Sequence, residues 1–312
     1  MAYITNDAAL DAANTAFETA ANSIFSGTVP GVWSQFTTLR PQTGKFAELD
    51  IVDGIPQFRE WIGSRQRKGL RAYSLNAPIR KWEMTLGIPV DDINGDKTGV
   101  VADRLSDFAG RGAVAYDQIL VPELLSNPVG YDEVGLFAAT HGRGNSLADQ
   151  NNIVTGALNY AAYRTARSTM RQFTDYYGEP IGILPTHLMV GPEQEEVAMQ
   201  VTGSDKLVGI DASGDLGGTI VDAGMLRNYI GGDANVIVSD RISGNEWCTF
   251  DLSKGAAKPM YAAEFLAPRT DILDDPTSEN VFYRDEIIYG ITAKLTPMAM
   301  AWQTAYGNPT GA

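Results

Sequence analysis

The stretch PQFREWIGSRQRKGLRAYSL, residues 56–75, differs in charge from the rest of the chain in which it lies. The 312 residues carry 38 acidic and 24 basic side chains, a formal net charge of −14. Residues 54–82 hold one acid and seven bases, so this window is at +6 and the remainder at −20. The seven bases are Arg59, Arg65, Arg67, Lys68, Arg71, Arg80 and Lys81. When an acidic protein collects its positive charge in one segment, that segment is suited to an acidic partner.

The basic window lies within residues 41–90, which we predict to form two extended segments joined by a long loop. A two-stranded ribbon alone in water is marginally stable, and Trp61 and Tyr73 gain about 1.5–3 kcal/mol each only if they are buried. We therefore expect the ribbon to lie across an acidic neighbouring copy of the chain. The alternative is that it folds back onto its own domain. Nucleic acid is the rival partner, which the acidic remainder of the chain disfavours.

The composition is that of a folded globular protein, since 44% of the residues are hydrophobic and 20% are charged. Cys248 is the only cysteine, which excludes an intramolecular disulfide and a multi-cysteine zinc site. The N-terminus lacks the pattern of a signal peptide. No run approaches ~18 consecutive apolar residues, so we expect no membrane span.

The hydrophobic periodicity predicts a mixture of helices and strands, an α+β protein. Amphipathic helices are expected at residues 6–25, 100–121 and 157–173, and Pro122 should kink or end the second. The first helix has apolar residues at helical spacing, among them Leu10, Phe17 and Ile24. Extended segments are expected at 45–54, 81–90, 235–240, 246–252, 258–265 and 285–295, the last of them ended or moved to a sheet edge by Pro297.

The chain has no complete catalytic or ligand-binding pattern. No glycine-rich segment has the flanking elements and the Lys-Ser/Thr pair of a phosphate-binding loop. His141 and His187 have no second ligand at a metal-binding spacing, so both are expected to be structural hydrogen-bonding residues. Cys248 alternates with aromatic residues and is expected to be a buried, inert thiol. We therefore predict no catalytic residue, no cofactor and no metal site.

Two groups of carboxylates could still serve other chemistry. Asp91 and Asp92 follow a predicted strand, and without a partner cluster we expect them in a solvated turn. Residues 271–275, DILDD, are expected to form a charged loop. A soluble hydrolase that uses Asp91 or Asp271 remains an alternative from a different functional class.

Seven segments, in this order, resemble the major head subunit family of Mu-like tailed bacteriophages. They are FREWIGSRQ (58–66), YSLNAPIRKWEMTLGIPVDDINGDKTG (73–99), GRGAVAYDQILVPELL (110–125), GYDEVGLFAATH (130–141), AAYRTARSTM (161–170), GILPTHLMVGP (182–192) and DEIIYGITAKLTPMAMAWQTAYGN (285–308). The resemblance covers roughly residues 30–308. One departure is that the family tends to read Tyr-Asp-Gly where this chain has Tyr131, Asp132 and Glu133.

The resemblance implies the Hong Kong 97-type phage capsid fold. Carried over by position, residues 1–40 would form an N-terminal arm and residues 41–90 an extended loop. A peripheral domain, with its spine helix at about 100–121, would combine residues 91–152 with residues 276–312. Residues 153–275 would form an axial domain near the centre of the capsomer.

The resemblance also implies a non-enzymatic function. The chain would be a major capsid protein that self-assembles into hexameric and pentameric capsomers of an icosahedral viral head around packaged double-stranded DNA. It would lie in the virion capsid after assembly in the host cytoplasm, with no membrane and no sequence-specific DNA contact. Portal protein, scaffold or other assembly helpers and decoration proteins are the expected partners. A nanocompartment shell of the same fold, enclosing protein cargo, is the alternative.

Three sets of contact residues follow from these assignments. The extended loop would contact neighbouring subunits through Arg59, Trp61, Arg65, Arg67, Lys68, Arg71 and Tyr73. The arm would pack through Leu10, Phe17 and Ile24. A loop at the capsomer axis would contain Ser213, Gly214, Asp215 and Leu216.

Overall fold

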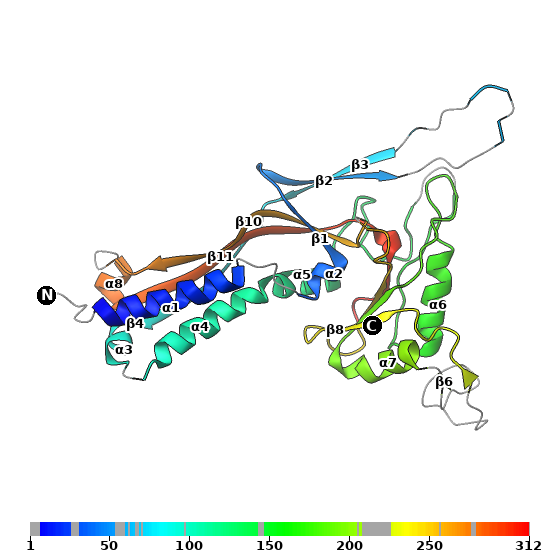
Figure 1. Cartoon of the computed structure of the whole chain (residues 1–312). Helices are drawn as coiled ribbons and strands as arrows, with labels where there is room; N and C mark the ends of the chain where they lie inside the picture. The colour runs from blue at the N-terminus through cyan, green and yellow to red at the C-terminus, as the bar shows by residue number, and fades with distance from the viewer. Residues whose placement is uncertain are drawn as a thin grey trace.

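The fold is known from a computed structural model of the chain (Figure 1). The residues that it describes are 7–25, 31–53, 60–61, 63–65, 69, 71–96, 98–142, 147–204, 206–207, 226–255, 257–275 and 279–311. The molecule is elongated, with long strands along one half, a smaller sheet with two helices in the other half, and a ribbon that projects from the body.

The long sheet has four strands in the order β1-β10-β11-β4. Its centre is an antiparallel pair of two 14-residue strands, β10 (Met260–Leu273) and β11 (Glu286–Ala299). On one side β1 (Thr37–Pro41) runs parallel to β10, and on the other β4 (Lys81–Pro89) runs antiparallel to β11. Buried and partly exposed residues alternate along β11 from Glu286 to Leu295, which shows that one face of the sheet is covered there.

Two helices cover that face. The helix α1 (Asp7–Phe25) lies beside α4 (Val100–Ala113), and both run along the sheet (Figure 1). Phe17 of α1 stacks on Phe108 of α4 at a ring distance of 6.0 Å and meets the edge of Tyr289 of β11 at 5.3 Å. These contacts form the core of this half, together with the short helix α3 (Val90–Gly95) and α8 (Glu279–Arg284) at its end.

The second half is built on a smaller sheet with the strand order β12-β9-β5-β8. Its strands are β5 (His187–Val190), β8 (Asn235–Val238), β9 (Trp247–Phe250) and β12 (Ala305–Asn308). The helices α6 (Tyr160–Arg171) and α7 (Glu195–Gly203) pack their apolar faces on it, α7 after the 3₁₀ turn η1 (Pro192–Gln194). All four residues of β9 are buried, so this sheet forms the centre of the largest core.

A two-stranded ribbon projects from the body, between β1 and β4 of the long sheet. It consists of β2 (Phe46–Asp53) and β3 (Arg71–Pro78), which pair antiparallel over eight residues each. Shorter elements complete the fold, namely α2 (Trp33–Phe36), α5 (Ala115–Leu125), η2 (Trp302–Thr304), β6 (Lys206–Leu207) and β7 (Leu226–Arg227).

The expected helix at 100–121 is divided, and the division is not at the proline. The chain leaves helical geometry at Val114, between α4 and α5, and α5 continues through Pro122 to Leu125. The prediction that Pro122 ends the helix is therefore wrong. Leu120, Val121 and Leu124 are fully buried around the proline, whose own ring is exposed, so packing holds this segment helical against the local preference.

Two strand predictions were too short. The segment expected at 258–265 is the start of β10, which continues to Leu273, so the loop expected at 271–275 is mostly strand. The strand expected to end or move to an edge at Pro297 does not end there, since it stays paired with β10 to Ala299. Its other side has no partner strand beyond Lys294 in the described chain, so the expectation of an edge is correct. Pairing between β11 and β4 stops at Lys294, and the proline lies beyond that point, so its missing N–H removes no bond to β4.

Candidate functional site

The ribbon carries the predicted contact residues, and the structure describes four of the seven. Trp61 is 65% exposed, donates its indole N–H to the Gly63 carbonyl at 2.7 Å, and lies under the Arg65 guanidinium at 4.5 Å. Arg71 and Tyr73 lie on β3. Arg59, Arg67 and Lys68 lie outside the described residues, as do Ser213, Gly214, Asp215 and Leu216 of the predicted axis loop.

The base of the ribbon packs against its own chain. Ala47 and Leu49 of β2 are buried against Tyr261 and Ala263 of β10 and against Met298 of β11. The opposite face of β2 is open, since Phe46 is 57% and Val52 is 59% exposed. The alternative, that the ribbon folds back onto its own domain, therefore holds for one face of its base, whereas the other face and Trp61 remain uncovered in this chain.

Aromatic side chains hold β3 to the rest of the chain where it leaves the loop. The Arg71 guanidinium lies 4.8 Å from the ring centre of Tyr73 and 5.1 Å from that of Tyr176. Tyr73 in turn contacts Tyr131 at a ring distance of 4.8 Å. Such cation–π and aromatic contacts contribute about 0.5–1.5 kcal/mol each. Arg71 and Tyr73 thus contact their own chain, and their predicted role between subunits remains a prediction.

One hydrogen bond completes this aromatic cluster. The Tyr177 hydroxyl donates to the Gly69 carbonyl at 2.5 Å, across 108 residues of sequence. Tyr177 lies in a tight turn in which the Asp175 side chain accepts the N–H groups of Tyr177 and Glu179. We call Arg71, Tyr73, Tyr131, Tyr176 and Tyr177 the tyrosine clip. Tyr131, Tyr176 and Tyr177 were not among the predicted contact residues, and the adjacent tyrosines in DYYGE were the available signal for the last two.

The predicted arm residues lie on α1, where they pack within this chain. Phe17 is fully buried, and Leu10 and Ile24 pack partly buried against the same core. Asn14 ties the helix to the sheet, because its Oδ1 accepts from the Tyr289 hydroxyl at 2.9 Å and its Nδ2 donates to Asp274 at 2.9 Å. Burial, with a smaller contribution from Asp274, raises the pKa of Tyr289 to about 12.

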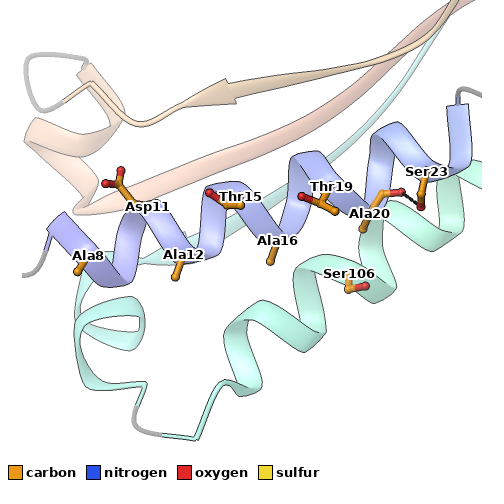
Figure 2. Close-up of a pocket in the computed structure, with 9 residues that line it drawn as sticks. All are labelled: Ala8, Asp11, Ala12, Thr15, Ala16, Thr19, Ala20, Ser23 and Ser106. Carbon is orange, nitrogen blue, oxygen red and sulfur yellow. Dashed lines mark hydrogen bonds between the residues drawn. The ribbon is translucent and has the colours of Figure 1, made fainter.

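The outer face of α1 borders a groove of 830 Å³ (Figure 2). Small side chains of α1 line it at successive turns, and Ser106 of α4 faces them. The lining residues are Ala8, Asp11, Ala12, Thr15, Ala16, Thr19, Ala20, Ser23 and Ser106. With one carboxylate and no histidine or cysteine, this groove has no set of groups for catalysis or metal binding.

The two histidines are structural hydrogen-bonding residues, as predicted. His141 is fully buried, with Nδ1 2.6 Å from Asp132 Oδ2 and Nε2 2.9 Å from Asn152 Oδ1. Its ring stacks on Trp302 at 4.0 Å. His187 Nδ1 lies 2.9 Å from the Thr186 hydroxyl, and burial, followed by nearby Lys258, lowers its pKa.

The remaining candidates for chemistry stay separate. Cys248 is buried in β9, where burial raises the pKa of its thiol, as expected of an inert cysteine. Asp91 lies in the first turn of α3, not in the expected turn, and Asp271 lies on β10 with the Thr292 hydroxyl at 3.1 Å. Within the described ranges no cluster of three or more histidine, cysteine or carboxylate side chains could hold a metal. None of the helices described there has the length and hydropathy to cross a bilayer.

Comparison with protein families gives a direct match. A family model described as "Phage capsid protein" matches residues 72–303, which is more than half of the chain. The chain therefore belongs to this phage capsid protein family. Comparison with curated proteins found no match.

Solved structures similar to this chain include a phage procapsid, a phage protein and a virus-like particle. The procapsid of bacteriophage JBD30 matches with a TM-score of 0.53 at 18% identity, over 97% of this chain and 75% of that chain. Microbacterium phage Oxtober96 matches with a TM-score of 0.55 at 7% identity, over 89% and 90%. A virus-like particle from Pyrococcus furiosus matches with a TM-score of 0.51 at 10% identity, over 94% and 96%.

These likenesses define the fold as the Hong Kong 97-type capsid fold, as the resemblance implied. Together with the family they make the chain a structural protein of a phage capsid. The functional surfaces to look for are accordingly those that meet other subunits, and the open face of the ribbon is the candidate predicted from the sequence.

Proposed function

We propose that this chain is the major capsid protein of a Mu-like tailed phage, which self-assembles into hexameric and pentameric capsomers of an icosahedral shell around double-stranded DNA. It acts as a structural subunit and not as a catalyst, and it needs no cofactor. Portal protein, assembly helpers and decoration proteins are its further partners. Assembly takes place in the host cytoplasm.

The observation that carries this proposal is the open face of the ribbon. Phe46, Val52 and Trp61 are all more than half exposed, in a segment that also carries the basic window of an acidic chain. Burying each of these side chains is worth about 1.5–3 kcal/mol. A shell made of identical acidic subunits supplies both the apolar cover and the negative charge that the ribbon lacks in one isolated chain.

The domain assignments follow as part of the proposal. Residues 1–40 act as the arm, residues 41–90 as the extended loop, and the small sheet with α6 and α7 as the axial domain. The peripheral domain contains α4, α5 and the central strands β10 and β11 of the long sheet, whose edge strands β1 and β4 fall within residues 1–90. We assign β12, expected in the peripheral domain, to the axial domain with the rest of the small sheet. Because β10 pairs with β11 at eleven positions, we assign residues 260–273 to the peripheral domain and end the axial domain before them.

Purification of the expressed chain tests the proposal. Size-exclusion chromatography and negative-stain microscopy should show capsomers or closed megadalton shells. A compact monomer at micromolar concentration, with no larger species in the presence of assembly helpers, would contradict it. A hydrolase acting through Asp91 or Asp271 would instead elute as a small oligomer.

A second candidate is a nanocompartment shell that encloses protein cargo. The likeness to the virus-like particle from Pyrococcus furiosus, which covers 96% of that chain, favours this candidate over a soluble hydrolase. The ratio of absorbance at 260 and 280 nm of particles purified from the native host separates a DNA-filled capsid from a nanocompartment, since packaged DNA raises the ratio and protein cargo leaves it near that of the empty shell.

A further inference from the structure

The long sheet ends in β4, and the outer side of this strand has no partner strand in the part of the chain that the structure describes. At one end of β4, the Leu295 N–H donates to the Arg80 carbonyl, and at the other the Val90 N–H donates to the Asp285 carbonyl. Peptide groups alternate between the two sides of an antiparallel strand, so the even-numbered residues of β4 face β11. The odd-numbered residues therefore turn their N–H and C=O groups outward, among them Lys81, Glu83, Thr85 and Gly87.

This edge lacks most of the devices that keep strands from pairing. Edge strands are usually very short, bulged, or protected by charges turned inward. β4 pairs with β11 at nine consecutive positions, from Pro89 opposite Glu286 to Lys81 opposite Lys294, without a bulge. Lys81 and Pro89 blunt only its two ends. In its middle Thr85 and Gly87 are small, so a second backbone can approach.

A groove of 430 Å³ accompanies the edge, between β4 and α4. Its less exposed lining is apolar, with Leu86, Ile88, Val101 and Phe108. Its exposed lining contains four charged residues, Arg104, Arg111, Asp92 and Asp107, beside Gly87, Pro89 and Val100. None of these four charges forms an ion pair with another residue of the described chain, including the pair Asp107 and Arg111, four residues apart on α4.

We propose that the outer edge of β4 is an interface between two copies of this chain, in which the two β4 strands pair antiparallel about a two-fold axis. The charges identify the occupant. The two arginines and two aspartates make the groove neutral in a chain of net charge −14. A second copy of the same groove therefore offers an aspartate for each arginine and an arginine for each aspartate. A two-fold contact places the same patch against itself and so needs this self-complementarity.

The inference rests on the proposed function, because a shell is the assembly in which copies of the chain meet at high local concentration. The outward peptide groups of one β4 then satisfy those of its partner, and the apolar groove is closed to water. Thr85, with a small side chain, and Gly87, with none, lie in the middle of the contact.

The test uses a proline at an outward-facing position of the full chain. Thr85→Pro removes one outward N–H but no bond to β11, and proline is tolerated on an edge strand in this position. Thr85→Val keeps the N–H and is the matched control. Each contact loses a hydrogen bond on both strands, so we expect Thr85→Pro to weaken association about tenfold or more, with Thr85→Val like wild type. Unchanged circular dichroism and thermal unfolding show that both variants fold.

Hydrogen exchange of the 81–89 peptide gives a second measurement. The outward amides should exchange fast in unassembled subunits and slowly in particles. Equal assembly of the two variants, or fast outward amides in particles, overturns the inference. Protection of the outward amides that appears only when an assembly helper is bound also overturns the inference, because the edge then pairs with that helper. If the wild-type chain forms no particles, the proposed function fails, but the interface can still be tested by sedimentation. A wild-type dimer that Thr85→Pro dissociates supports the interface, and a wild-type monomer overturns it.

Discussion

The small sheet and the ribbon differ in how far each is covered by its own chain. In β9 of the small sheet all four residues are buried, under α6, α7 and neighbouring strands. In β2 of the ribbon, buried and exposed residues alternate, and two large apolar side chains face outward, Phe46 at 57% and Val52 at 59% exposure. The small sheet can therefore be stable in an isolated subunit, while the ribbon has surface whose burial is left to contacts outside it.

Truncating one phenylalanine in each region tests whether the small sheet and the ribbon differ in how much they stabilise the isolated subunit. Phe250 of β9 is fully buried and stacks on Phe36 at 6.0 Å, so Phe250→Ala should lower the free energy of unfolding of the isolated subunit by about 3–5 kcal/mol. Phe46→Ala should change it by only about 0.5 kcal/mol and reduce assembly instead. Denaturant unfolding measures the first effect and light scattering during assembly the second. Equal losses of stability would show that the ribbon is as self-contained as the sheet.

The sequence predicted the small sheet better than the ribbon's surroundings. The segments 235–240 and 246–252 were expected as strands, and β8 and β9 lie inside them, because short apolar runs are a local signal. The full length of β10 was missed because Pro268, Arg269 and Asp271 break the alternation. The structure accommodates them with shifts of register after Glu264 and Leu266.

Charge and aromatic content predicted only part of the candidate contact site. These identified the ribbon and Trp61, which is exposed. They could not identify the tyrosine clip, because Tyr177 reaches Gly69 from 108 residues away. Such a partnership depends on how the halves of the chain pack together and has no local pattern. For the same reason the helix break at Val114 was not foreseen.

The second test concerns Tyr289, which joins α1 to the long sheet. Its side chain is fully buried, like the residues of β9 in the small sheet. Its pKa is about 12, above its ordinary value of 10.0, so its contribution is fully present below pH 10 and is lost as the pH rises towards 12. The difference in free energy of unfolding between wild type and Tyr289→Phe should therefore shrink by about 1 kcal/mol between pH 9 and pH 11. Chemical denaturation at both pH values measures it. A constant difference would mean that the phenol is accessible to solvent.

The third test concerns the turn beside Tyr131, one of the points where the body meets the ribbon. Glu133 has a φ of 65°, a left-handed conformation that costs a residue with a side chain about 1–2 kcal/mol. This is the position at which the resembling family tends to have glycine. After the extra flexibility of glycine in the unfolded chain is counted, Glu133→Gly should stabilise the subunit by about 0.5–1 kcal/mol. Glu133→Ala keeps the side-chain clash and should not stabilise. Thermal unfolding of both variants decides, and equal melting temperatures would exclude strain at this turn.

The smallest expected effect on global stability lies at the tyrosine clip, where the ribbon leaves the body. Tyr177→Phe removes only the hydroxyl that donates to the Gly69 carbonyl, a bond worth about 1 kcal/mol. Local opening should therefore rise about fivefold, and trypsin should cleave after Arg71 faster by the same factor in unassembled subunits, with little change in global stability. Tyr229→Phe is the control, because Tyr229 is 82% exposed. Equal cleavage rates in wild type and both variants would mean that the hydrogen bond to Gly69 does not anchor the ribbon. The packing of its base on β10 and β11 would then be its anchor, and the part of the ribbon held by its own chain would end at Arg71 and not at Gly69.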